Sequence, residues 1–149
     1  MDKNPRWFGQ NSTPTGSLNP ALGLTGIRLC LAEPVMFRTQ MRAILRAATH
    51  GPVRMMWPMI TSISEVRQCL IHLDTAQRQL AERDEAFGPV SIGCMIEIPS
   101  AAMTVGSILK LVDFISVGPN DLIQYILSVD RGAASVSHPS TTGHHTVLT

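Results

Sequence analysis

Two short apolar runs set the pattern from which the fold can be predicted. They span residues 91–97 and 113–118, and a segment with helical spacing follows each of them. Apolar runs of strand length that alternate with helix-length segments are typical of βαβ units, whose parallel strands are buried on both faces. The pattern therefore predicts an α/β fold with a parallel sheet.

A helix is predicted upstream, where Phe37, Met41 and Leu45 recur at helical spacing. Pro34 stands near its start, and Gly51 and Pro52 stop it. Three basic residues line its other face: Arg38, Arg42 and Arg46. A solvated face is the expected role of this arginine row, and binding of a phosphate is the alternative.

A further strand and a long helix are predicted next. The strand lies within residues 53–60 and should end at Pro58, because proline cannot donate to a central ladder. Ser62 and Glu65 have the spacing of a capping box, which marks a helix start. His72 stands alone within that helix and is expected to be a surface histidine.

The rest of the chain divides into one ordered region with a polar segment on each side. Further helices are predicted over residues 101–111 and 122–127. Residues 1–17 are polar and are expected to form a poorly ordered lead-in, and residues 133–149 lose apolar periodicity and are expected to form a flexible tail. The predicted domain is therefore residues 18–132.

Composition excludes several classes of function. The chain has 149 residues, 44% of them hydrophobic, and a formal net charge of +1, so no electrostatic footprint for nucleic acid is visible. No apolar run approaches the ~20 residues that a membrane-spanning helix needs, and no signal peptide is recognisable. Cys30, Cys69 and Cys94 lack metal-ligand spacing and are expected to be reduced thiols of a cytoplasmic protein.

Acidic residues follow both apolar runs at the positions where chemistry is expected. Glu97 ends the first run and Asp121 follows the second, and the carboxyl ends of parallel strands are the usual place for active sites. Two carboxylates can share Mg²⁺ or Mn²⁺, which prefer oxygen ligands. Asn120 could contact a substrate oxygen or cap a helix, and Arg131 could bind a phosphate. The alternative is structural: Asp121 caps a helix, and Glu97 pairs with a basic side chain.

No nucleophile is recognisable in the sequence. Ser100 and Ser116 have no histidine near them in the chain, and the glycines form neither a phosphate-binding loop nor a dinucleotide fingerprint. The residues alone therefore leave open whether this chain is an enzyme.

Three stretches together resemble a known family, the phosphoenolpyruvate-utilising enzymes, and within it the enzyme I group of the bacterial sugar phosphotransferase system. They are GCMIEIPSAA at 93–102, FISVGPNDLIQY at 114–125 and VDRG at 129–132, with NPALG at 19–23 in support. The resemblance implies a partial (β/α)₈ TIM barrel from the carboxyl end of a longer enzyme. It amounts to roughly half a barrel, because a whole one usually needs about 200 residues or more.

The resemblance also implies roles for the acidic pair and its neighbours. Glu97 and Asp121 match Mg²⁺ (or Mn²⁺) ligands, and Asn120 and Arg131 match contacts to the phosphate of phosphoenolpyruvate. In the family the phosphoryl group passes to a histidine on a separate domain and then to the carrier protein HPr.

The chain departs from the family at two positions. Thr25 stands where the family has a phosphate-binding arginine, and Pro119 replaces a threonine. The domain with the phosphorylated histidine and the proton-donating cysteine are also missing, so the implied function is phosphoenolpyruvate and Mg²⁺ binding without phosphotransfer by this chain alone. The alternative is a non-catalytic interaction module that self-associates, as a homo-oligomer, or pairs with a full-length enzyme I.

Overall fold

Three parallel strands alternate with helices in the part of the chain that the structure describes. The computed structural model describes residues 23–128. The strands are β1 (Val53–Trp57), β2 (Val90–Ile96) and β3 (Phe114–Val117). The helices are α1 (Ile27–Ala32), α2 (Pro34–Ala47), α3 (Ile63–Ala81), α4 (Pro99–Met103), α5 (Val105–Ile108) and α6 (Pro119–Leu127). The α/β pattern predicted from the sequence is confirmed for these residues.

The strand β2 lies between β1 and β3 and is parallel to both of them. Asp113 helps to hold β3 in register, because its carboxylate accepts a hydrogen bond from the Ile92 amide at 2.8 Å while its own amide donates to the Ile92 carbonyl at 2.8 Å. All three strands run in the same direction, so the residues that follow them meet at one edge of the sheet. We call this edge the carboxyl edge.

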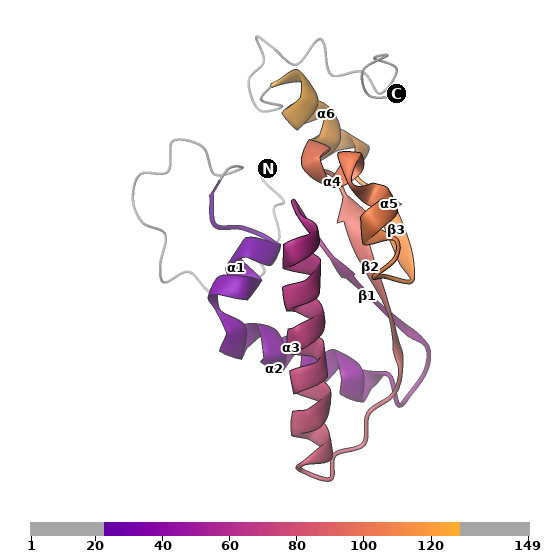
Figure 1. Ribbon diagram of the computed structural model, residues 1–149. Coiled ribbons are helices and arrows are strands. Elements are labelled where there is room, and N and C mark those ends of the chain that lie inside the picture. Colours follow the sequence, from indigo (N-terminus) through magenta and orange to yellow (C-terminus); the bar gives the residue numbers. More distant parts are fainter. Residues whose placement is uncertain (1–22, 129–149) are drawn as a thin grey trace, which may run out of the picture.

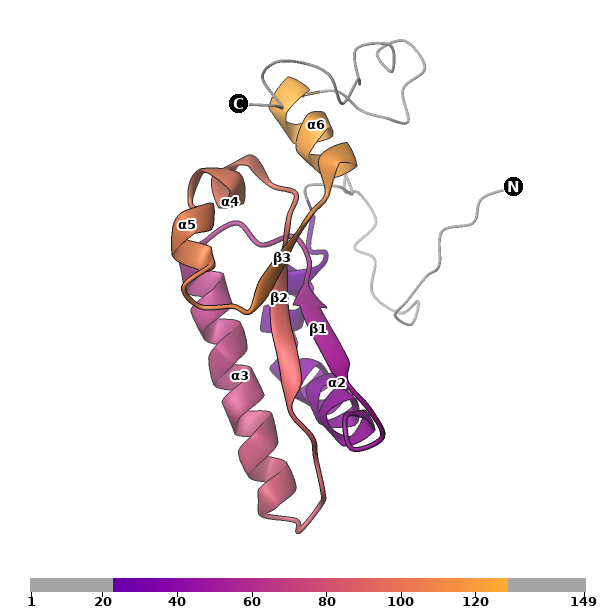
Figure 2. The ribbon, with the colours of Figure 1, turned by 90° about the vertical axis from the view of Figure 1, so that its right-hand side faces the viewer.

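Three helices cover one face of the sheet, and no helix within residues 23–128 covers the other face, which we call the open face. Figure 1 shows α1, α2 and α3 on one side of the strands, and Figure 2 turns the strands towards the viewer. Alternate strand residues point to the helices and are buried: Met55, Trp57, Ile92, Cys94 and Ile96. The open face carries Arg54, whose guanidinium lies 5.3 Å from the centre of the Phe114 ring. The exposed side chain of Met56 lies on the same face.

The two long helices form where the apolar spacing predicts them. In α2, Phe37, Met41 and Leu45 are buried at intervals of four residues. The helix α3 begins with the predicted capping box, in which the Ser62 side chain accepts from the Glu65 amide and the Glu65 side chain accepts from the Ser62 amide. These two helices supply most of the apolar surface that packs on the sheet.

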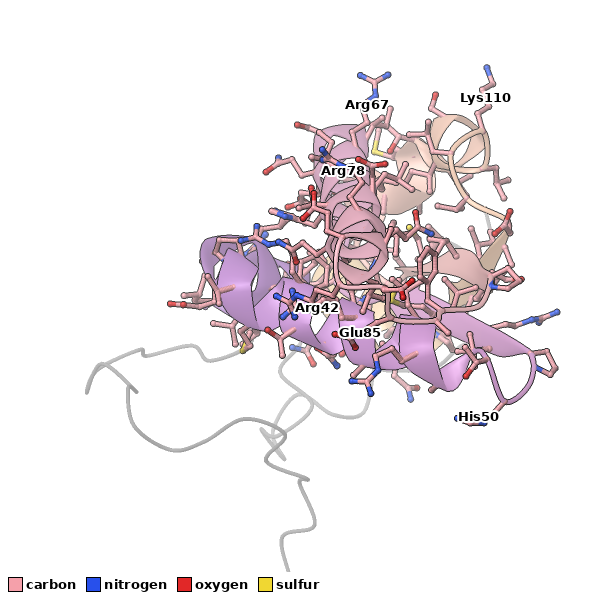
Figure 3. The ribbon with its side chains drawn as sticks, turned by 90° about the horizontal axis from the view of Figure 1, so that it is seen from below. Arg42, His50, Arg67, Arg78, Glu85 and Lys110 are labelled. Atoms are coloured by element: carbon pink, nitrogen blue, oxygen red, sulfur yellow. The ribbon has the colours of Figure 1, made fainter. Side chains whose placement is uncertain are left out.

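Polar side chains join α2 to α3 and to the turn after α3, and we call this set of contacts the α2–α3 polar layer. Its cross-links are Arg38–His72 at 3.3 Å, Arg42–Gln79 at 2.6 Å and Arg46–Glu85 at 3.2 Å. Figure 3 shows Arg42 and Glu85 near the junction of the two helices, whereas Arg67 and Lys110 project outwards. The expectation that the arginine row only meets solvent is wrong for Arg38 and Arg42, because α3 packs alongside and offers them acceptors.

His72 is also less isolated than expected. It is half-buried, and its ring lies edge-on to that of Phe37 with 5.8 Å between the centroids. Burial lowers the pKa of His72, and the nearby Arg38 guanidinium lowers it further. A charged imidazole would lose the hydrogen bond from Arg38, so the packed arrangement favours the neutral ring.

Two helix boundaries differ from the prediction. Instead of one helix over residues 101–111, the chain forms α4 and α5, separated at Thr104. The Thr104 hydroxyl donates to the Ser100 carbonyl at 2.9 Å, and such back-bonding competes with a regular helix. The last helix begins at Pro119 rather than Leu122, because proline is well suited to the first helical position.

Several of the predicted segments fall outside residues 23–128. The lead-in at 1–17 and the tail at 133–149 lie outside the described residues, as does the end of the predicted domain. Cys30, Cys69 and Cys94 are free thiols. Between residues 23 and 128, every helix is too short or too polar to cross a lipid bilayer.

Candidate functional site

The two carboxylates predicted from the sequence come together at the carboxyl edge. Glu97 immediately follows β2, and Asp121 is the third residue of α6, which follows β3. A hydrogen bond joins the two side chains. The pair forms because neighbouring parallel strands end side by side, which brings together residues that are 24 positions apart in the sequence.

Glu97 is held rigidly in this pair. Its side chain is only 4% exposed, and Glu97 is the one charged residue within residues 23–128 that is buried. Its Oε1 accepts a hydrogen bond from the Met59 amide at 2.6 Å. A methyl group added at Gly118 would lie 2.8 Å from the Glu97 Cβ and 3.1 Å from Oε2, so the absence of a side chain there makes room for the carboxylate. One Glu97 oxygen is therefore anchored by backbone, and the other lies against the start of α6.

The surroundings of Glu97 disfavour a free negative charge. Burial raises the pKa of Glu97 and is the largest cause. The Met59 amide acts in the opposite direction, and the negative charge of Asp121 and its hydrogen bond raise the pKa further. Two adjacent carboxyl groups either share a proton or need a cation to neutralise them.

Two carboxylates suit an open Mg²⁺ or Mn²⁺ site better than a structural zinc site. Among residues 23–128, the ion pairs join Arg46 and Arg83 to Glu85 and Arg78 to Asp74, so none of them neutralises Glu97. No group of three or more His, Cys, Asp or Glu side chains with metal-binding geometry occurs there either. Mg²⁺ commonly uses one or two carboxylates and completes its shell with water and substrate oxygens, whereas structural zinc needs four protein ligands.

Asn120 and Asp121 lie in the first turn of α6. The N-cap residue is Gly118, which has no side chain to cap the helix. Asp121 is the acidic residue of this turn, where the helix dipole favours a negative charge, so a structural role for Asp121 remains the alternative to metal binding. Asn120 is exposed in the first turn of α6, where it adjoins the carboxylate pair in sequence. Arg131, the expected phosphate ligand, lies outside the described residues.

No motif in the sequence points directly to the loop that anchors Glu97. Met59 adopts a positive φ of 56°, which is uncommon for a residue other than glycine. Pro58 indicated only that β1 ends there. The contact between Met59 and Glu97 spans 38 positions and depends on the pairing of β1 with β2.

Comparisons with known proteins agree with the resemblance noted in the sequence. Residues 11–149 match the family model described as PEP-utilising enzyme, PEP-binding domain. The chain is 50% identical over 133 residues to the phosphoenolpyruvate-protein phosphotransferase of Cupriavidus necator, covering 89% of this chain and 23% of that protein. The proteins of the same name from Listeria monocytogenes and Haemophilus influenzae are 45% and 40% identical, over 81% and 88% of this chain. The chain spans 21% and 23% of those two relatives.

Proposed function

This chain belongs to the family of phosphoenolpyruvate-binding domains of the PEP-utilising enzymes, and on that premise we propose that it carries the metal-binding part of a phosphoenolpyruvate site. The observation that supports the proposal is the contact between the buried Glu97 and the half-buried Asp121 at the carboxyl edge of a parallel sheet. The printed name of the relatives, phosphoenolpyruvate-protein phosphotransferase, supports phosphoenolpyruvate as the ligand.

The proposed architecture is an arc of a (β/α)₈ barrel. A (β/α)₈ barrel has eight parallel strands inside a ring of helices, so three such strands with helices on one face correspond to about three-eighths of a barrel. The open face of the sheet would then be part of the barrel interior. The proposed domain is residues 18–132. In this arrangement the carboxyl edge is the face on which barrel enzymes place their active sites.

Each proposed residue has a distinct task. Glu97 and Asp121 would hold Mg²⁺ or Mn²⁺, Asn120 would donate to a phosphate oxygen, and Arg131 would bind the phosphate through its planar fork. When bound, the cation would neutralise negative charge on the phosphate and carboxylate of phosphoenolpyruvate. The buried position of Glu97 keeps water from competing on that side, so the carboxylate is oriented before any ligand arrives.

The proposal is limited to binding. The chain spans less than a quarter of the length of its relatives, and Thr25 is an uncharged side chain where the family pattern has an arginine. In the full-length enzyme the phosphoryl group would pass to a histidine of another domain and then to HPr. We propose that this chain binds phosphoenolpyruvate and the cation but does not complete the transfer alone, and that it acts in the cytoplasm.

Titration with Mn²⁺, followed by the paramagnetic resonance signal of the free ion, tests this proposal. The wild type should bind Mn²⁺, and Glu97→Gln and Asp121→Asn should each remove the binding. Asp74→Asn is the matched control, since it removes an exposed carboxylate on α3 that pairs with Arg78 at 3.0 Å. Addition of phosphoenolpyruvate with Mg²⁺ should raise the unfolding temperature of the wild type but not that of Glu97→Gln or Asp121→Asn. Identical titration curves for all four proteins would contradict the proposed site.

The open face of the sheet favours a second candidate function, an interaction module. Arg54, Met56 and Phe114 lie on this face, which no helix of the described chain covers. The occupant would be a second copy of the chain or a full-length enzyme I. Sedimentation over a range of concentrations tests self-association. Met56→Glu should weaken the dimer, whereas Ile71→Glu, which changes an exposed apolar residue on α3, should not. A monomer at every concentration would contradict self-association.

A further inference from the structure

The loop between β1 and α3 carries more hydrogen bonds than the start of a helix requires. A capping box needs one contact from the Glu65 side chain, to the Ser62 amide, which it makes at 3.1 Å. The same Oε2 atom also accepts from the Thr61 amide at 2.6 Å and from the Thr61 hydroxyl at 2.9 Å. Glu65 therefore holds the loop one residue beyond the cap, towards the carboxyl edge.

A second contact ties Thr61 to the neighbouring strand connection. The Ser100 hydroxyl, which lies just after β2, donates to the Thr61 carbonyl at 2.9 Å. The amide, hydroxyl and carbonyl of Thr61 are thus all engaged by side chains. A backbone segment restrained in this way has little freedom to shift relative to β2.

Met59 lies two residues before Thr61, and the segment around Gly26 packs closely against its side chain. Its φ of 56° is in the left-handed region, which a non-glycine residue keeps only where its surroundings impose it. Gly26 faces it, and a methyl group there would lie 2.8 Å from the Met59 Cγ. In this conformation the Met59 amide points at Glu97 and donates to Oε1.

We propose that Glu65 is a positioning residue for Glu97, acting through Thr61 and the amide of Met59. The anchored Oε1 leaves Oε2 as the oxygen that faces Gly118 and α6, and Oε2 is the atom that would bind the cation. This inference rests on the proposed function. Partners that orient a metal ligand typically change metal affinity about 10- to 100-fold when they are removed.

Glu65 could instead serve only as the cap of α3, and the experiment must distinguish this structural role from the positioning role. Ser62→Ala separates the two, because it removes the acceptor of the Glu65 amide at 3.3 Å but leaves the Glu65 side chain free to hold Thr61. Glu65→Ala removes the cap and the contacts to Thr61 together. Glu65→Gln keeps one side-chain oxygen and serves as the conservative variant.

The experiment combines Mn²⁺ titration with amide exchange of Met59 in the metal-free protein, measured by nuclear magnetic resonance. Glu65→Ala should weaken Mn²⁺ binding at least about 10-fold and speed exchange at Met59. Ser62→Ala should lower the unfolding temperature but leave both quantities unchanged, and Glu65→Gln should restore part of the affinity.

Three results would overturn the inference. The first is Met59 exchange that is unchanged in Glu65→Ala, the second is a loss of Mn²⁺ affinity that is equal in Glu65→Ala and Ser62→Ala, and the third is a wild-type Mn²⁺ affinity in Glu65→Ala. The proposed function fails separately, if the wild type and Glu97→Gln bind Mn²⁺ alike. If Glu97→Gln loses Mn²⁺ while Glu65→Ala binds it as the wild type does, only the positioning role is wrong.

Discussion

The carboxyl edge and the α2–α3 polar layer are both networks of charged side chains, but they differ in what surrounds each charge. In the polar layer, arginines meet neutral or opposite partners such as Gln79 and Glu85 at the surface. At the carboxyl edge, a buried carboxylate meets a backbone amide and a second carboxylate. The first arrangement pairs positive groups with neutral or negative ones, whereas the second places two carboxyl groups side by side, which favours a shared proton or a bound cation.

The comparison shows why charge alone does not reveal a site. The arginine row places three like charges on one helix face, and two of its members serve the packing of one helix on another. The candidate site rests on a single pair of acidic residues, Glu97 and Asp121. Their positions at strand ends, rather than their number, distinguish them. Variants should therefore separate the two regions: changes at the edge should alter metal binding, and changes in the layer should alter stability.

The largest effect is expected from Glu97→Gln. Mn²⁺ affinity should fall by more than about 100-fold, because loss of a direct ligand should cost more than loss of a residue that only orients a ligand, which costs up to about 100-fold. The free energy of unfolding should change by less than about 1 kcal/mol, because the amide oxygen can still accept from Met59. Metal titration and urea unfolding on the same samples measure both. Equal losses of affinity and stability would show that Glu97 only supports the fold.

Gly118→Ala should come next. The added methyl group meets the Glu97 Cβ at 2.8 Å, and overpacking of this kind costs about 1–3 kcal/mol. Mn²⁺ binding should weaken as well, because Glu97 must move. Gly106→Ala in α5 is the control, since its methyl group would meet no atom within 4 Å apart from its chain neighbours and the backbone of its own helix. Unaltered metal binding in Gly118→Ala would contradict the close fit.

Arg42→Ala tests the other region. Loss of the hydrogen bond to Gln79 should destabilise the protein by about 1 kcal/mol and leave Mn²⁺ binding unchanged. Arg67→Ala, which removes an outward-pointing arginine, should have almost no effect on either quantity. A change in metal affinity in Arg42→Ala would mean that the two regions are coupled.

The smallest effect is expected from the titration of His72. Its pKa in the folded protein is lowered from the usual 6.5, so the unfolded chain takes up its proton at a higher pH than the native protein does. The contribution of His72 to stability is complete above about pH 6.5 and declines as the pH falls below that value. Urea unfolding between pH 5 and 8 should show a steeper decline for the wild type than for His72→Gln. Parallel curves would contradict the lowered pKa.

Local patterns predicted much of the fold. The capping box of Ser62 and Glu65 depends on residues three apart, and the stripe of Phe37, Met41 and Leu45 depends on one helix. The break at Thr104 was not predicted, because apolar spacing continues through it while a single hydroxyl bond interrupts the helix. The long-range partners of the arginine row were not predictable either, since they belong to another helix.

The candidate site divides in the same way. The sequence by itself determined that Glu97 and Asp121 follow strands, and the direction of parallel strands was enough to place them at one edge. Only the tertiary structure decided that Glu97 is buried, that Met59 donates to it, and that Gly118 makes room for it. The physical reason is range. Strand and helix signals lie within a few residues, whereas burial and the orientation of a carboxylate depend on groups that the folded sheet brings together from 20 to 40 positions away.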